Sequence, residues 1–136
     1  MRSGSRVPAN LKELTILLVA RSQRCEFQWH SHTPVAKAAG ISQAAIHAVR
    51  DQRRPIDLTD AEAATYDAVN ELLKTQRISD TTFHTLRKSV GAELLIDIVG
   101  IAGYYVALAM ILNTAQVVHR QTVTEDLSEF GQERTP

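Results

Sequence analysis

The feature that most constrains this chain is an apolar segment at residues 94–112, LLIDIVGIAGYYVALAMIL. As a helix it is nearly long enough to cross the roughly 30 Å hydrocarbon core of a bilayer. Asp97 opposes a membrane span, because a carboxylate is costly in lipid, and no lysine or arginine cluster follows closely to anchor the far end. We therefore expect a helix of the protein core or of a subunit interface, and no membrane partner.

Length, charge and cysteine count narrow the class of protein. The 136 residues fit one compact domain. The 15 lysines and arginines balance 15 acidic residues, so no long-range field would attract nucleic acid or an anionic membrane surface. The single cysteine cannot form an internal disulfide, and the first ten residues lack the apolar stretch of a secretory signal. We expect a cytoplasmic protein without a nucleic-acid partner.

Helix signals recur along the chain, whereas no run of alternating apolar and polar residues predicts a strand. Asn10, Ser42, Thr59 and Ser79 are the expected N-caps of four helices. Expected helices cover about residues 11–22, 25–40, 43–50, 61–76, 80–89 and 92–117. The predicted fold class is all-α, a compact bundle of about six helices spanning residues 1–118, followed by a polar tail at 119–136.

The chemistry-bearing residues gather in CEFQWHSH, residues 25–32. On a helix Cys25, Trp29 and His32 share one face, but two turns separate the thiol from the imidazole by about 10 Å. Glu13, on the preceding helix, would bridge them if the two helices pack antiparallel. Cys25 would then lie near a helix N-terminus, where the positive end of the helix dipole lowers a thiol pKa.

Each of these residues also has a purely structural interpretation. Glu13 falls at the N3 position of a helix capped by Asn10, where a glutamate completes the cap. Cys25 can be a small buried hydrophobe, Trp29 a core residue and His32 a hydrogen-bonded core histidine.

We expect no metal site in this segment. His30 and His32 diverge by about 200° on a helix, so they cannot both ligate one ion there. No second cysteine or histidine pair stands at a recognised metal-binding spacing.

Three stretches, ELTILLVARSQRCEFQWHSHTPVAKAAGIS, AVNELLKTQRISDTTFHTLR and GIAGYYVALAMILNTAQV, resemble the carboxymuconolactone decarboxylase-like family, which includes the alkyl hydroperoxidase D proteins. The resemblance implies an all-α bundle, AhpD-like, that assembles into symmetric homo-oligomers. It also implies a site of a glutamate, a Cys-x-x-Cys pair and a histidine, matched here by Glu13, Cys25 and His32. Gln28 stands where the second cysteine would be. Relatives usually carry further helices before the first one here, so we expect the shortened start to expose a face or to shift the oligomer.

The resemblance leads to three functional hypotheses. The first is a thiol-dependent peroxidase without a bound cofactor: Cys25 attacks a peroxide, Glu13 and His32 relay protons, and an external thiol restores the sulfur. Trp29, Gln28 and Tyr104 would line its pocket. The second is a cofactorless decarboxylase or lyase acting on a small carboxylated lactone or organic acid, with His32 moving the proton and Cys25 a spectator. The third is a helical assembly module without catalytic activity.

Overall fold

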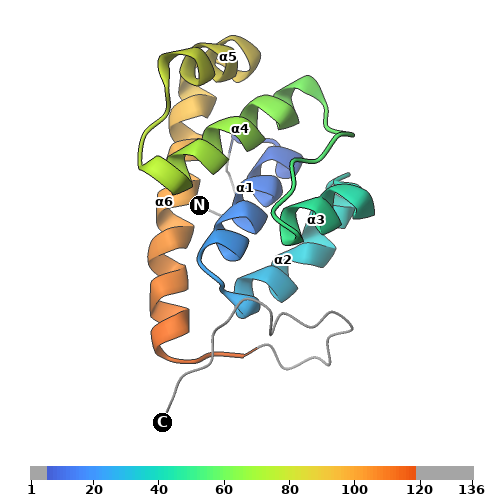
Figure 1. Ribbon diagram of the computed structural model, residues 1–136, viewed down its shortest axis with the longest axis vertical. Helices are drawn as coiled ribbons and strands as arrows, with labels where there is room; N and C mark the ends of the chain where they lie inside the picture. Colours follow the sequence, from blue (N-terminus) through green and yellow to red (C-terminus); the bar gives the residue numbers. More distant parts are fainter. Residues whose placement is uncertain (1–5, 119–136) are drawn as a thin grey trace.

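In the computed structural model, which describes residues 6–118, the chain forms six α-helices and no strand within that range. The helices are α1 (Ala9–Ser22), α2 (Glu26–Ala38), α3 (Gln43–Arg50), α4 (Asp60–Thr75), α5 (Asp80–Val90) and α6 (Ala92–Thr114), shown in Figure 1. This confirms the predicted all-α class and the number of helices. The predicted polar tail, residues 119–136, lies outside the described residues.

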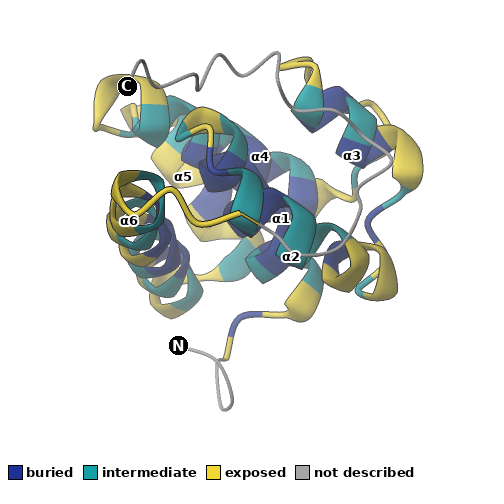
Figure 2. Ribbon diagram, turned by 90° about the horizontal axis from the view of Figure 1, so that it is seen from below, coloured by how far each residue is buried: buried dark blue, intermediate teal, exposed yellow. Residues whose placement is uncertain are grey.

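Helix α1 forms the centre of the bundle. It packs against α2, α4 and α6, and Figure 2 shows it enclosed by the other helices. Every residue from Glu13 to Ala20 is buried. Leu11, Leu14 and Leu18 predict an apolar stripe on one face, but the neighbouring helices cover more of the circumference than that stripe. A polar side chain in the middle of α1 must therefore find its partner inside the protein.

Three predicted helix starts are confirmed. The Ser42 hydroxyl accepts the backbone N–H of Ala45, and the Ser79 hydroxyl caps α5 in the same way. Thr59 and Glu62 form the predicted capping box, in which each side chain accepts the backbone N–H of the other residue. These caps depend only on residues three apart, so the local sequence suffices to specify them.

The predicted start of the first helix is wrong. Helix α1 begins at Ala9 with Pro8 at the N-cap position and without a side-chain cap hydrogen bond. The Asn10 side chain instead donates a hydrogen bond to Glu62 Oε2, 3.1 Å away. Glu13 therefore lies beyond the N3 position, and the capping role for its carboxylate is also wrong.

Helix α6 has two apolar faces. One buries residues such as Ile98, Ile101 and Tyr105 against the bundle, as expected for a core helix. The other carries exposed Ile96, Tyr104, Met110 and Ile111. By length and composition alone α6 could cross a membrane, and about a third of its most apolar window, 33%, is buried within the fold. Asp97 at its start is paired with Arg6, 2.9 Å from the guanidinium Nη2.

Candidate functional site

The site begins with the tight connection between α1 and α2. Arg24 adopts a positive φ of 53°, and the backbone N–H of Cys25 donates to the carbonyl of Ala20 at 2.8 Å. The chain therefore reverses at once, and α2 runs back along α1. This reversal brings Glu13 on α1 opposite His32 on α2.

Glu13 and His32 form a direct pair. Glu13 Oε2 lies 2.8 Å from His32 Nδ1. The Glu13 side chain is only 6% exposed and the His32 side chain 23% exposed. An ionised carboxylate can only accept, so the pair places the imidazole proton on Nδ1 and leaves Nε2 as the nitrogen that can exchange a proton. A partly exposed imidazole held by a buried carboxylate is suited to proton transfer.

Tyr105 on α6 completes the surroundings of this pair. Its ring meets the His32 ring edge-on, with centroids 5.5 Å apart and planes at 86°. The backbone carbonyl of Tyr105 accepts a hydrogen bond from Gln28 Nε2 at 3.0 Å. Gln28 and His32 are four residues apart on α2, so they share a face. Glu13, Gln28, His32 and Tyr105 therefore form one group contributed by α1, α2 and α6.

Gln28 supplies a further polar atom to this group. Its side chain is buried, and its Oε1 has no hydrogen-bond partner among the described residues. A buried acceptor without a partner costs free energy and marks a place where a water molecule or a ligand donor would bind. Gln28 thus places a buried amide oxygen at the position where the family resemblance predicted a second cysteine.

Cys25 has different surroundings. It occupies the N-cap position of α2, as expected, but is 1% exposed. The expectation of a lowered thiol pKa is wrong: burial raises the pKa of Cys25 above its ordinary value, and the charge of Glu26 acts in the same direction. The nearby backbone N–H groups of Gln28 and Phe27 act against this rise without outweighing it. Glu13 and His32 are not among the groups that shift this pKa.

The two aromatic residues expected to line a pocket lie in different environments. Trp29 is fully buried and belongs to the hydrophobic core, as its structural interpretation has it. Tyr104 is 50% exposed and packs edge-on against Tyr105, with ring centroids 5.1 Å apart. Tyr104 therefore borders the group around His32 from the solvent side of α6.

Sequence reasoning selected Tyr104 and missed its neighbour Tyr105. The missed signal was helical spacing: Ile98, Ala102, Tyr105 and Ala109 recur at intervals of three or four residues and are all buried. That stripe predicts that Tyr105, and not Tyr104, faces the bundle. No local pattern, however, identifies His32 as the residue that it meets.

Within residues 6–118, no group of three or more histidine, cysteine, aspartate or glutamate side chains is arranged to hold a metal ion. His30 and His32 both lie inside α2, where their side chains diverge. The polar chemistry of the site therefore consists of the carboxylate, the imidazole and the Gln28 amide.

Fold and site together define an all-helical protein with a buried glutamate–histidine pair at the contact of three helices. The sequence model of the Carboxymuconolactone decarboxylase family matches residues 1–71, slightly more than half of the chain. The chain therefore belongs to that family, as its resemblance predicted. The match includes Glu13, Cys25, Gln28 and His32, whereas Tyr105 lies outside it. No curated protein and no solved structure matches the chain.

Proposed function

We propose that this protein catalyses proton transfer in the decarboxylation or isomerisation of a small carboxylated lactone or related organic acid, without a cofactor. The observation that carries the proposal is the 2.8 Å contact between Glu13 Oε2 and His32 Nδ1, with the carboxylate almost completely buried. His32 is the acid–base residue and Glu13 is a positioning residue that fixes the tautomer and orientation of the imidazole.

In the proposed decarboxylation, Glu13 and His32 act on a substrate that loses its carboxylate. The bond between carbon and the leaving carboxylate breaks, CO₂ departs, and the electron pair moves into the conjugated lactone carbonyl. His32, charged at that stage, donates its Nε2 proton to the substrate carbon and regains one from water. The Glu13 carboxylate stabilises the imidazolium before the transfer, as the aspartate does in serine-protease triads. Gln28 Oε1, which has no hydrogen-bond partner within residues 6–118, accepts a hydrogen bond from the substrate or from a water beside it.

The thiol-peroxidase hypothesis receives less support from these surroundings. A peroxide is attacked by the thiolate, but burial raises the Cys25 pKa and keeps the side chain from solvent. A sulfenic acid on Cys25 would also lack an internal resolving thiol, since the chain has a single cysteine. The proton-transfer proposal needs neither thiolate nor reductant.

Matched variants separate the two chemistries. CO₂ release from carboxymuconolactone and peroxide consumption with dithiothreitol would be measured for the wild type, His32→Phe, Glu13→Gln and Cys25→Ser. We expect decarboxylation to fall about 10²- to 10⁴-fold in His32→Phe, the usual contribution of a general acid–base residue, and to persist in Cys25→Ser. Trp29, buried and the only tryptophan, reports on folding in each variant.

The thiol-peroxidase hypothesis would be favoured by the reverse pattern. In that pattern Cys25→Ser no longer consumes peroxide, and His32→Phe decarboxylates the substrate as the wild type does. A wild-type protein that performs neither reaction would favour the assembly module. In either case the proton-transfer proposal would be rejected.

We also infer that a second copy of the chain covers the outer face of α6. Ile96, Tyr104, Met110 and Ile111 are exposed and fall within one side of the helix at about 100° per residue. Contiguous exposed apolar side chains of this kind are typical of interaction surfaces. The homo-oligomer implied by the family resemblance would bury them.

A further inference from the structure

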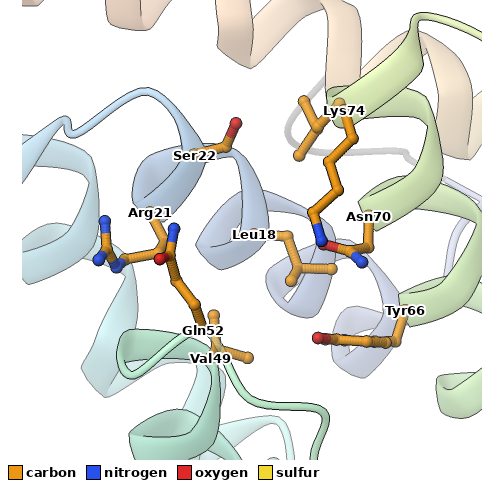
Figure 3. A pocket seen from close by; sticks show the side chains of 9 residues that line it. Leu18, Arg21, Ser22, Val49, Gln52, Tyr66, Asn70 and Lys74 are labelled. Atoms are coloured by element: carbon orange, nitrogen blue, oxygen red, sulfur yellow. The ribbon is translucent and has the colours of Figure 1, made fainter.

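A polar pocket lies on another side of α1, away from the glutamate–histidine pair. It has a volume of about 320 Å³, within the size range of small-molecule sites. Its walls come from α1, from the end of α3 with the turn after it, and from α4 (Figure 3). Its lining residues are Leu18, Arg21, Ser22, Val49, Gln52, Tyr66, Asn70, Leu73 and Lys74.

This pocket is separate from the glutamate–histidine pair. Its α1 residues lie roughly 80° to 180° around the helix from Glu13 and about 7 to 14 Å further along the axis. It opens between α1, α3 and α4, whereas the pair faces α2 and α6. A ligand bound here would not touch His32.

The charges that line the pocket are all positive. Arg21 contributes a guanidinium from α1 and Lys74 an ammonium from α4, and none of the lining residues is acidic. Arg21 Nε donates to the backbone carbonyl of Arg50 at 2.6 Å, which fixes the position of the guanidinium. Lys74 has no acidic partner within residues 6–118. Two cations on opposite walls would attract an anion with two charged groups.

Neutral groups in the same pocket supply donors and an apolar wall. Tyr66 is 6% exposed, and its hydroxyl makes no hydrogen bond to another described residue. Figure 3 shows Tyr66, Asn70 and Lys74 extending from α4 into the pocket. Leu18 and Val49 give an apolar surface for a short carbon chain. A few placed donors around an apolar surface are characteristic of sites for small organic ligands.

From this arrangement we propose that the pocket binds a small organic dicarboxylate. Arg21 holds one carboxylate, and Lys74 with Asn70 holds the other. The Tyr66 hydroxyl donates to whichever oxygen lies nearest, and the leucine and valine side chains contact the carbon chain. Binding does not depend on the reaction proposed for Glu13 and His32.

Calorimetric titration of the full chain with sodium succinate tests this site. We expect saturable binding to one site that weakens with added salt. Lys74→Gln should weaken it about tenfold or more, the effect of losing a hydrogen bond to a charged group, and Tyr66→Phe should weaken it a few-fold. Lys88→Gln, at an exposed lysine on α5, makes the same charge change elsewhere and should leave binding unchanged.

Acetate, inorganic phosphate and a His32→Phe variant complete the test. Acetate should bind at least about tenfold more weakly than succinate, because it engages one cation only. His32→Phe should bind succinate as the wild type does, even though its activity is lost. The proposal is overturned if succinate shows no saturable binding, if phosphate binds as tightly as succinate, if Lys88→Gln matches Lys74→Gln, or if His32→Phe abolishes binding.

Discussion

A double-mutant cycle on Glu13 and His32 tests whether the buried carboxylate depends on its imidazole partner. His32→Phe keeps a ring against Tyr105 but leaves the Glu13 charge buried without its hydrogen bond. Such a loss costs about 2–3 kcal/mol of unfolding free energy, at the lower end for buried pairs because His32 still reaches water. Glu13→Gln keeps an acceptor and removes the charge, so it should cost about 1 kcal/mol.

The double variant shows whether Glu13→Gln raises or lowers the unfolding free energy once His32 has been replaced. In the His32→Phe background the Glu13→Gln change should stabilise the protein, because an amide is less costly to bury unpaired than a carboxylate. The expected coupling energy is about 2 kcal/mol, within the range measured for residues in direct contact. Urea unfolding followed by Trp29 fluorescence measures it, since this single tryptophan is fully buried.

A matched cycle on Asp80→Asn and His84→Phe serves as the control. These residues are four apart on the exposed side of α5, and their coupling should stay below about 0.5 kcal/mol. If the Glu13–His32 coupling is equally small, or if Glu13→Gln does not stabilise His32→Phe, the carboxylate is satisfied without the imidazole. The proton-transfer pair would then be refuted.

Native Cys25 should react with iodoacetamide more slowly than a free thiol and only at higher pH, because burial raises its pKa. Unfolding in urea should restore ordinary thiol reactivity. Rapid alkylation of the native protein at pH 7 would contradict the prediction. Hydrogen bonds from Ser79 and Thr82 lower the pKa of Glu71, so its stabilising effect is present above its ordinary pKa and lost as pH falls through the lowered value. The stability gap between wild type and Glu71→Gln should therefore close on acidification, and a gap independent of pH would disprove this role. Ile111→Glu should reduce the oligomer size measured by light scattering, whereas an unchanged size would exclude the outer face of α6 as the contact.

The fold was predictable where the signals are local. Ser42, Thr59 and Ser79 each cap a helix through a residue three positions later, and that spacing is visible in the sequence. The start of α1 was not predictable in this way. Asn10 is a residue type that commonly caps helices, but its side chain donates a hydrogen bond to Glu62, fifty-two residues away. Tertiary contacts decided that position over local preference.

In the candidate site, too, features that depend on neighbouring helices were predictable, whereas features that depend on distant contacts were not. Glu13 was expected to bridge Cys25 and His32 across an antiparallel hairpin of consecutive helices, which short connections favour. The structure pairs Glu13 with His32, whereas the contacts that act on the Cys25 thiol come from Phe27, Gln28 and Glu26. The raised pKa of Cys25 was not anticipated, because it depends on how completely other helices cover the thiol. The helix N-terminus, considered alone, predicts a lowered pKa. The role of Tyr105 requires a contact with Gln28 across 77 positions, which no motif encodes.

Tyr104 and Tyr105 are neighbours in sequence, yet one faces solvent and the other meets His32. A molecule bound to the outer face of α6 at Tyr104 would contact a ring that packs directly against Tyr105, the residue that meets His32. Movement of α6 on self-association would change the edge-on contact between Tyr105 and the His32 imidazole. The rate of the proposed proton transfer should therefore depend on protein concentration, because self-association through α6 would alter the packing around Tyr105.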